Sequence, residues 1–427
     1  MSNRFHALAL LEELVTANRK KLAHISVFYL DLDRFKYIND TWGHRTGDSF
    51  IAALAERLQK DFCNEVIIAR MSGDEFLIVA ENLQEPVERQ FFADRIFKSF
   101  ERPFEFSHRT LQMSASVGSS TFPEDGRDAE SLIKNAEIAM YRAKELGIGL
   151  YVPYQVELHN AMKQKIYIEN KLRSSVNSGC QEFCAYFQPK LDVLTGEITS
   201  CEALMRWNSP EGMINPMEFI PQAEESGLIV PLSWWMIREC CRQCREFEKQ
   251  GVDCSVAINV SAQVLLHNDF LPVLRSAVET AGIDYAKLDI EIVEQTLVED
   301  IVKVNEVITT LHALGVEISV DDFGTGYSSL SYLNKMAVDR IKIDRSFVMT
   351  IGNSAENQAI INAIIAMSKS LHMVITAEGV ETREQYDFLK EANCEEIQGY
   401  LISKPMPAQE YIKFVKQWTP ASIDAAE

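Results

Sequence analysis

The chain has 427 residues, a length that suggests two or three domains, and its 47% hydrophobic residues are enough for packed cores. Its 62 acidic and 42 basic side chains leave a formal net charge of −20, which argues against binding of nucleic-acid polymers through a basic surface. No run of about 18 or more uncharged apolar residues is present to span a membrane. The nine irregularly spaced cysteines indicate free thiols in a reducing compartment, so we expect a cytoplasmic protein with no membrane contact from this segment.

The first 150 residues are predicted to form an α/β domain. An apolar run at 25–30 predicts a strand that ends in Asp31-Leu32-Asp33, and two apolar runs around Ser72-Gly73-Asp74-Glu75 are typical of a β-hairpin. The spacing of apolar residues predicts helices at 47–60, 87–100 and 128–146, and their alternation predicts a strand at 110–119. If the strand ending at Asp31 lies beside the hairpin tipped by Asp74, the two carboxylates can share Mg²⁺ over a triphosphate.

The rest of the chain is predicted to form a helical connector at 151–178 and a barrel at 179–420. The connector has no Gly- or Ser-rich stretch, so a helix rather than a flexible tether should join the two halves. Strands are predicted at 183–189, 198–205, 254–259, 288–293, 316–321, 340–343, 373–377 and 396–401, and intervening helical patterns favour a (β/α)8 barrel. The segment between Pro189 and Ile198 is too short for a crossover helix, so the first two strands should pair antiparallel.

Polar residues stand at one end of nearly every predicted barrel strand. Because the carboxyl ends of parallel barrel strands meet at one mouth, we expect these side chains to lie together. Carboxylates and an Asn carbonyl are hard oxygen ligands suited to Mg²⁺ or Mn²⁺, and so many like charges would repel one another without cations. The adjacent pair Asp321-Asp322 can bridge two metals, as in phosphodiester hydrolysis. The residues concerned are Glu202, Asn259, Glu291, Glu294, Asp321, Asp322, Lys342, Asp344 and Glu378.

A series of ordered motifs runs through this half of the chain. They are Gln188-Pro189, Glu202-Ala203-Leu204, Asn259-Val260-Ser261, Glu291-Ile292-Val293-Glu294, Asp321-Asp322-Phe323-Gly324-Thr325-Gly326, Lys342-Ile343-Asp344, Glu378-Gly379-Val380-Glu381 and Gln398-Gly399-Tyr400. Over roughly residues 165–415 the sequence resembles the EAL family, the cyclic di-GMP phosphodiesterases. The resemblance implies a TIM-like barrel that hydrolyses cyclic di-GMP to the linear dinucleotide pGpG with two Mg²⁺ or Mn²⁺ ions.

The resemblance also implies a role for each matched position. Glu202, Asn259, Glu291, Asp321 and Asp322 would hold the metals, with Asp321 bridging them, while Lys342 and Glu378 would orient or deprotonate the attacking water. Gln188, Leu204, Arg206 and Gln398 would bind the substrate, and Glu294 would anchor the glycine-rich loop at 322–329. These positions show no departure from the family pattern, which favours an active enzyme over a non-catalytic cyclic di-GMP receptor.

Motifs in the first half include Asn39-Asp40, Gly47-Asp48, Ser72-Gly73-Asp74-Glu75-Phe76 and Tyr141-Arg142-Ala143-Lys144. They resemble the GGDEF, or diguanylate cyclase, family, which has a palm-like α/β fold. The resemblance implies that Asp31, Asp74 and Glu75 serve the metal and nucleotide, that Asn39 and Asp48 read guanine, and that Lys144 contacts phosphate.

This copy departs from the GGDEF pattern. Ser72 replaces the first motif glycine, Ile148 stands where the family often has a phosphate-binding Arg, and Cys63 and Val66 replace the Arg and Asp of a product-inhibition site. We therefore expect a GTP-binding domain with little or no cyclase activity that regulates the phosphodiesterase. The alternative of a bifunctional cyclase and phosphodiesterase stays open.

The resemblance to the two families carries expectations beyond the sites. Both families often associate, which favours a homodimer. The start of the chain at Asn3-Arg4-Phe5 resembles the end of the opening segment of the GGDEF family. We expect that a sensor segment precedes it in the full-length protein, and that such a segment could tether the protein to a membrane.

Overall fold

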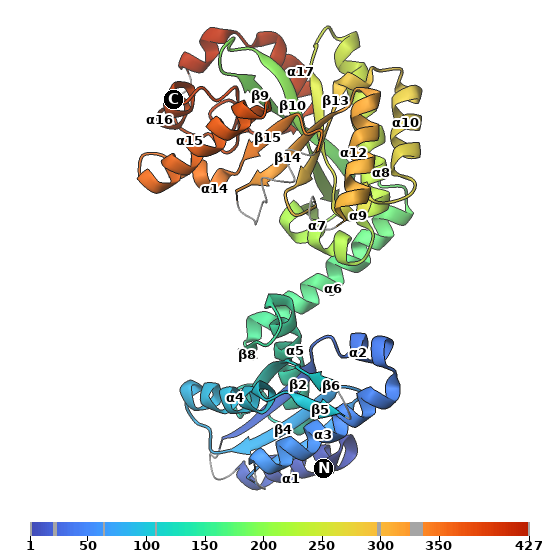
Figure 1. Ribbon diagram of the computed structural model, residues 1–427, viewed down its shortest axis with the longest axis vertical. Coiled ribbons are helices and arrows are strands. Elements are labelled where there is room, and N and C mark those ends of the chain that lie inside the picture. The colour runs from blue at the N-terminus through green and yellow to red at the C-terminus, as the bar shows by residue number, and fades with distance from the viewer. Residues whose placement is uncertain are drawn as a thin grey trace. The chain divides into compact units, whose positions relative to one another are not determined.

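The computed structural model describes residues 2–19, 24–62, 65–106, 109–296, 300–324 and 336–425 (Figure 1). The chain divides into two compact units, Met1–Ile166 and Tyr167–Glu427. Of the predicted features, Cys63 and residues 325–329 of the glycine-rich loop lie outside the described residues. Within the described part, no helix combines the length and the apolar character needed to cross a bilayer.

The first unit contains a mixed sheet with helices on both faces. Its elements are β1 (Ser2–Asn3), α1 (Arg4–Asn18), β2 (Ile25–Leu32), α2 (Phe35–Trp42), α3 (His44–Phe62), β3 (Ile67–Ser72), β4 (Glu75–Glu81), α4 (Pro86–Glu101), β5 (Phe104–Phe106), β6 (Arg109–Leu111), β7 (Ala115–Phe122), α5 (Ala129–Leu146) and β8 (Tyr151–Pro153). The sheet order is β1-β3-β4-β2-β7-β8, with β2 antiparallel to both β4 and β7. The predicted hairpin is β3–β4.

Strand β2 is buried along its whole length because both faces of the sheet are covered. Phe28 and Leu30 pack in one apolar cluster with residues of α3 and α4, whereas Val27 and Tyr29 pack in another with residues of α1 and α5. A strand without a polar face must lie inside a sheet covered on both sides. The apolar run at 25–30 therefore becomes the centre of the domain.

The predicted single strand at 110–119 is wrong. The structure has two strands there, β6 and β7, and β6 pairs with β5 in a separate two-stranded ribbon. The segment between β6 and β7 hydrogen-bonds to the end of β2 instead, because the Asp33 amide donates to the Ser114 carbonyl at 3.0 Å. The alternation of apolar residues runs through both strands, so periodicity alone could not locate the break.

Helix α6 (Val156–Asn177) lies where the connector helix was predicted and contains the division between the two units. The second unit then comprises β9 (Phe183–Asp192), β10 (Ile198–Ser209), β11 (Gly212–Ile214), α7 (Pro216–Glu225), α8 (Ile229–Lys249), β12 (Ser255–Asn259), α9 (Ala262–Leu265), α10 (Phe270–Ala281), η1 (Tyr285–Lys287), β13 (Leu288–Val293), α12 (Ile301–Leu314), β14 (Glu317–Phe323), β15 (Arg340–Ile343), α14 (Arg345–Val348), α15 (Ala355–Ser370), β16 (Val374–Ala377), α16 (Arg383–Glu391), β17 (Glu396–Gln398), β18 (Met406–Pro407), α17 (Ala408–Gln417) and η2 (Pro420–Ala425).

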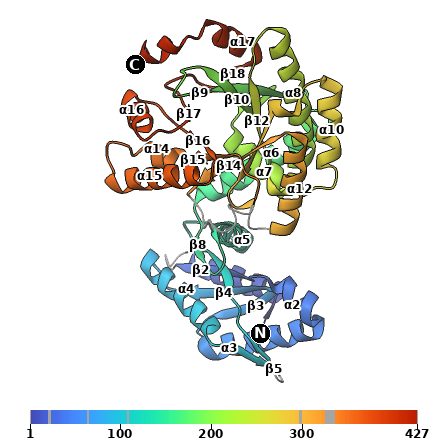
Figure 2. The ribbon, with the colours of Figure 1, turned by 45° about the horizontal axis from the view of Figure 1, so that its top comes forward.

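The second unit is an eight-stranded barrel, which confirms the predicted fold. The barrel strands follow the order β10-β12-β13-β14-β15-β16-β17-β9, and β9 closes the barrel by pairing with β10. β9 is antiparallel to both of its barrel neighbours, as the short 189–198 connection predicted. Helices α8, α10 and α12 flank the strands on one side and α14, α15 and α16 on the other (Figure 2).

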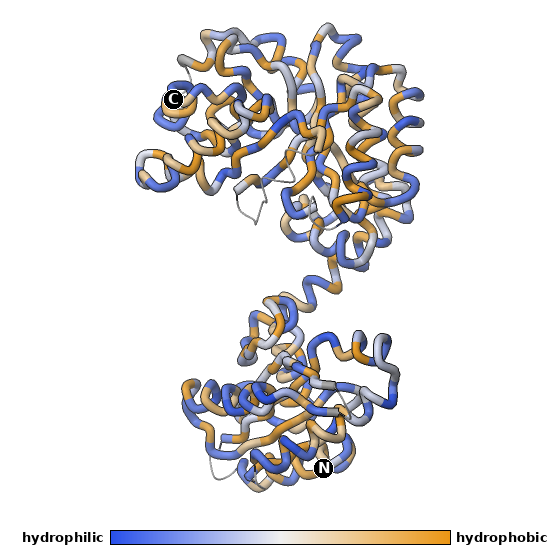
Figure 3. Tube along the Cα trace, in the orientation of Figure 1, coloured by the Kyte–Doolittle hydropathy of each residue, from blue (hydrophilic) through white to orange (hydrophobic). Residues whose placement is uncertain are grey.

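The outer helices of the barrel are amphipathic. Hydrophobic and hydrophilic residues alternate along α10 and α12 (Figure 3). Their apolar residues, among them Phe270, Leu274, Ile308 and Leu311, belong to one continuous core cluster with the barrel strands. Burial of these side chains fixes the helices on the barrel wall and leaves the strand ends to form the mouth.

Candidate metal centre and active site

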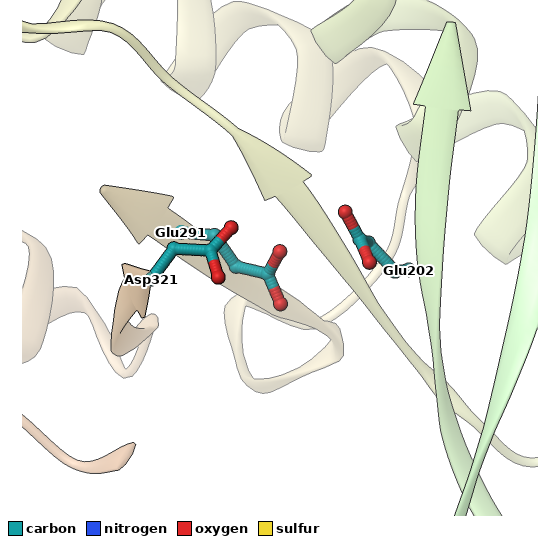
Figure 4. A group of neighbouring side chains, drawn as sticks. All are labelled: Glu202, Glu291 and Asp321. Atoms are coloured by element: carbon teal, nitrogen blue, oxygen red, sulfur yellow. The ribbon is translucent and has the colours of Figure 1, made fainter. Parts of the chain in front are cut away.

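Two groups of carboxylates meet at the mouth of the barrel, and Asp321 belongs to both. In one group Asp321 joins Glu202 and Glu291, and in the other it joins Asp322 and Glu378; within each group the oxygen atoms lie within 4.8 Å of one another. The first three side chains come from β10, β13 and β14 (Figure 4). The strand register staggers these positions: Glu202 pairs with Ala257, Asn259 with Glu291 and Val293 with Asp321, so each of the three carboxylates stands two residues farther along its strand than the one before. The tilt of barrel strands converts this stagger into side chains that meet at the mouth.

The ammonium group of Lys342 lies among these carboxylates and is completely buried. Its Nζ is 2.6 Å from Glu378 Oε1 and 2.7 Å from Glu291 Oε2. The same atom is 3.2 Å from Asp321 Oδ1 and 3.7 Å from Glu202 Oε2. Lys342 therefore contacts members of both carboxylate groups and balances part of their charge.

A second buried lysine supports the site from the barrel interior. Lys190, on β9, places Nζ 2.6 Å from Glu291 Oε1 and 3.8 Å from Asp289 Oδ2. Asp289 in turn accepts a hydrogen bond from Arg340 at 2.9 Å. Both oxygens of Glu291 are thus held by ammonium groups, which fixes its carboxylate at the floor of the mouth. Sequence analysis missed Lys190, which follows directly after the strand predicted at 183–189 and belongs to the longer observed strand β9.

The pKa values of the acids differ sharply. Burial would raise the pKa of Glu291, but the adjacent Lys190 and Lys342 lower it to about 2. Burial raises the pKa of Glu378 to about 8, and Asp321 and Glu202 add to that effect against the opposing attraction of Lys342. Burial and then Asp321 raise the pKa of Asp322 to about 6. More carboxylates converge here than the lysines can neutralise.

This donor set fits divalent cations. Oxygen-rich groups that share Asp321 suit the hard ions Mg²⁺ and Mn²⁺. Burial, together with neighbouring carboxylates, raises the pKa values of Asp322 and Glu378, and a bound cation would favour their ionised forms. The residues present therefore match the metal site that the sequence predicted.

Amide side chains hold Glu202 in place. Asn259 Nδ2 donates to Glu202 Oε1 at 2.6 Å, and Gln398 Nε2 donates to Glu202 Oε2 at 2.6 Å. Gln398 Nε2 also lies 3.0 Å from Gln188 Oε1. The N–H groups of Asn259 are used towards Glu202, which leaves its carbonyl oxygen for a cation. Gln398, which the sequence assigned to substrate, is therefore bonded directly to a predicted metal ligand, and Gln188 is linked to the same ligand through Gln398.

A pocket of about 740 Å³ opens beside the carboxylates. Of the predicted substrate-binding residues, Gln188, Leu204, Arg206 and Gln398 all line it. Sequence analysis missed another part of its wall, which comes from β11 and the start of α7 and includes Met213, Asn215 and Met217. It also missed Arg345, which lines the pocket and pairs with Glu381 at 2.8 Å. No motif marks these residues, because they come from short elements that follow the barrel strands β10 and β15.

Two glycine-linked features shape the rim. Glu294 is buried and accepts a hydrogen bond from the Gly324 amide at 2.9 Å, so it holds the described start of the loop that it was predicted to anchor. Gly399 packs closely against the loop that follows β16. A Cβ added to Gly399 would lie 2.0 Å from the Val380 carbonyl oxygen. This contact keeps Gln398 next to the segment that carries Glu378.

The predicted nucleotide residues of the first unit fall in two places. Asp31 and Glu75 stand opposite each other on β2 and β4, so the two strands are neighbours as the metal hypothesis required. Burial raises the pKa of Asp31 to about 6, although Lys144 Nζ lies only 2.5 Å from its Oδ1. Asp74 is in the turn between β3 and β4, half-buried.

The two predicted guanine-reading residues do not share one cavity. Asp48 lines a pocket of about 600 Å³ with Arg70 and Ser72. Asn39 is not among its lining residues and instead packs against Gly47, where an added Cβ would lie 2.1 Å from Asn39 Oδ1. The carboxylate of Asp33 accepts hydrogen bonds from the Ser114 and Ser116 hydroxyls and from the Gly149 amide. These bonds give Asp33 a structural role.

Comparison with known proteins agrees with this division. The EAL domain family matches residues 169–405, and the diguanylate cyclase GGDEF domain family matches residues 1–149. The cyclic di-GMP phosphodiesterase NbdA of Pseudomonas aeruginosa is 37% identical over 92% of this chain and 50% of its own length. The bifunctional diguanylate cyclase/cyclic di-GMP phosphodiesterase MucR of the same species is 34% identical over 95% of this chain and 59% of its own length. The chain thus spans about half the length of the curated relatives it matches.

Solved structures place the second unit in the same fold. The PaMucR phosphodiesterase in complex with c-di-GMP is 36% identical, with a TM-score of 0.55, and the match covers 57% of this chain and 99% of that one. Together with the ordered motifs and the closed barrel with its reversed strand, these matches assign the family. The chain belongs to the EAL domain family and carries a GGDEF domain ahead of the EAL barrel.

Proposed function

We propose that the second unit hydrolyses cyclic di-GMP to pGpG with two Mg²⁺ or Mn²⁺ ions. The observation that carries the proposal is the sharing of Asp321 by two carboxylate groups around Lys342, beside a pocket that holds Arg206. Shared carboxylates of this kind suit two cations on one phosphodiester. The names of NbdA and PaMucR, which mention cyclic di-GMP, support the choice of substrate.

The residues would divide the chemistry as follows. Arg206, half-buried in the pocket wall, would bind a phosphate oxygen, and Gln188 and Gln398 would bind polar edges of the substrate. Glu378, with a pKa of about 8, is suited to exchange protons near neutral pH, and we assign it the proton of the attacking water. Lys342 holds Glu378 at 2.6 Å and so orients it.

The metal ligands would be Glu202, Asn259, Glu291, Asp321 and Asp322. When bound, the two cations would acidify water and offset the charge that develops on the phosphoryl oxygens. In the reaction a bond forms between water oxygen and phosphorus, and the bond from phosphorus to the 3′ oxygen breaks. The proton taken by Glu378 can return to that leaving oxygen, which gives the linear product.

Chromatographic turnover of cyclic di-GMP with Mg²⁺ or Mn²⁺ tests the proposal. We expect conversion to pGpG by the full chain, and its loss by about 100-fold or more in Glu202→Ala. The matched control is Glu248→Gln, which removes a surface carboxylate paired with Arg245 and should leave the rate unchanged. Absence of conversion by the unmodified chain would instead indicate a non-catalytic receptor.

For the first unit, we propose GTP binding and regulation of the hydrolase, with weak or absent cyclase activity. The facing pair Asp31 and Glu75 and the pocket lined by Asp48 support binding of a metal-nucleotide. The departures at Ser72 and Ile148 argue against efficient cyclisation. GTP can change the hydrolysis rate only if it binds one conformation of the chain more tightly than another.

Bifunctional activity is the second candidate, because the facing carboxylates of Asp31 and Glu75 are retained. Incubation of GTP with Glu202→Ala, which should not destroy the product, tests it. Appearance of cyclic di-GMP would establish a cyclase, and its absence would leave GTP as a regulatory ligand.

Two further features of the protein are proposals as well. The described cysteines are all free thiols, which supports a reducing, cytoplasmic compartment. Association as a homodimer follows from the family resemblance alone.

A further inference from the structure

We propose that the first turns of α6 form one wall of the nucleotide site, and that Lys163 binds the terminal phosphates of GTP. This inference rests on the proposed GTP binding of the first unit. It adds a binding residue from outside the domain that supplies Asp31, Asp48 and Glu75.

The proposal starts from a cavity of about 450 Å³ in the first unit. One side is formed by the ends of β2 and β4 and another by α5, while α6 closes it with four residues of its first turns. The cavity brings carboxylates and basic groups together. The charged and titratable residues that carry the argument are Asp31, Glu75, Lys134, Lys144, His159 and Lys163.

Within the ranges that the structure describes, two of the three lysines that line this cavity form no ion pair, although Glu137 also lines the wall. Lys144 pairs with Asp31, but among the described residues neither Lys134 nor Lys163 forms an ion pair. Burial, followed by the charges of Lys163 and Lys134, lowers the pKa of His159, so these three groups lie close together. The shielded Nδ1 of His159 also has no hydrogen-bond partner in the described part of the chain. The ammonium groups of Lys134 and Lys163 are therefore available to a bound anion.

The carboxylates in the same cavity indicate which anion fits. Phosphate alone would be repelled by Asp31, Glu75 and the nearby Glu137. A phosphate chain that carries Mg²⁺ supplies a cation for these carboxylates and anionic oxygens for the lysines. The cation would bind Asp31 and Glu75 and release Lys144 towards phosphate. Met162 and Ile166 of α6 add apolar side chains to the same wall.

The cavity lies next to the pocket of Asp48. Ser72 lines that pocket, Glu75 lines the α6 cavity, and the Ser72 hydroxyl donates to the Glu75 carboxylate. A single nucleotide can therefore place its base near Asp48 and its phosphates near α6. Because α6 is one uninterrupted helix from Val156 to Asn177, a ligand held by Lys163 acts directly on the segment that leads to the barrel.

Calorimetric titration of the full chain with GTP or GMP, in the presence of Mg²⁺, tests the proposal. Lys163→Met should weaken GTP binding by about ten-fold, the value of one charge-assisted hydrogen bond. It should leave GMP binding unchanged, since a single phosphate does not extend to α6. Lys163→Arg, which keeps the charge, should restore most of the GTP affinity.

The matched control is Lys165→Met. Lys165 lies two positions away on the same helix, is not part of the cavity wall, and pairs with Glu145 at 2.8 Å. Equal weakening by Lys163→Met and Lys165→Met, or GTP affinity unchanged in Lys163→Met, would overturn the role of Lys163. Failure of the unmodified chain to bind GTP would overturn the proposed GTP site as well. Hydrolysis of cyclic di-GMP without GTP, measured on the same samples, reports separately on the barrel.

Discussion

Removal of the charge of Lys190 should destabilise the barrel although Lys190 touches no substrate. Lys190→Met keeps most of the volume of the side chain and leaves Glu291 with one ammonium partner instead of two. The lowering of the Glu291 pKa from 4.5 to about 2 corresponds to about 3 kcal/mol of attraction, shared by Lys190 and Lys342. Loss of one partner of a fully buried pair adds the cost of an unpaired charge, so we expect a loss of about 2–4 kcal/mol in unfolding free energy.

Urea unfolding followed by tryptophan fluorescence measures this loss, because Trp207, Trp234, Trp235 and Trp418 all lie in the second unit. The double variant Lys190→Met with Glu291→Gln should recover part of the stability, since no unpaired carboxylate remains. Arg173→Met, which breaks an exposed pair with Glu169, should cost about 0.5 kcal/mol or less. If Lys190→Met costs no more than that control, or if the double variant is no more stable than the single one, the ion-pair reasoning is refuted.

Three other predictions concern the mouth of the barrel. Glu378→Gln should lower the hydrolysis rate by about 100-fold while the protein stays folded, as checked by circular dichroism, because the residue loses its capacity to accept a proton; a rate near that of the unmodified chain would contradict this. Because the folded pKa of Glu378 is about 8, above its usual value of 4.5, its contribution to the stability of metal-free protein should be complete below about pH 4.5 and be lost as pH rises to about 8. Thermal unfolding with chelator should show that fall, and added Mn²⁺ should reduce it; a flat profile would speak against the raised pKa. Gly399→Ala places a methyl 2.0 Å from the Val380 carbonyl oxygen and should cost about 1–3 kcal/mol together with most of the activity, whereas unchanged unfolding would show that the loop can move.

Much of the barrel could be predicted from the sequence because its strands are apolar runs of the right length with polar residues at one end. Strands β13 and β15 fall on the predicted ranges, and the short connection before Ile198 predicted the reversed pairing of β9. These are local signals that the fold preserves. The break between β6 and β7 was missed because the alternation continues through it, and only pairing with β5 reveals it.

The site was predictable to the extent that its residues end strands. Glu202, Glu291 and Asp321 are not paired in register but are staggered by two residues from each to the next, and the strand tilt of a barrel brings such positions together at its mouth. Lys190 was missed because its role depends on which face of β9 points inward. The α6 wall of the nucleotide cavity was missed for a related reason, since Lys163 looks like any solvated charge on a polar helix until the fold places it beside acidic strands.

The reversed direction of β9 decides at which end the chain enters the barrel. In a barrel whose first strand is parallel to the rest, the chain enters at the amino-terminal ends of the strands, opposite the active site. Here Phe183, at the start of β9, pairs with Trp207, which lies beyond Glu202 towards the catalytic rim. The segment that precedes β9 is therefore attached at the end of the barrel that carries the carboxylates of the proposed metal centre.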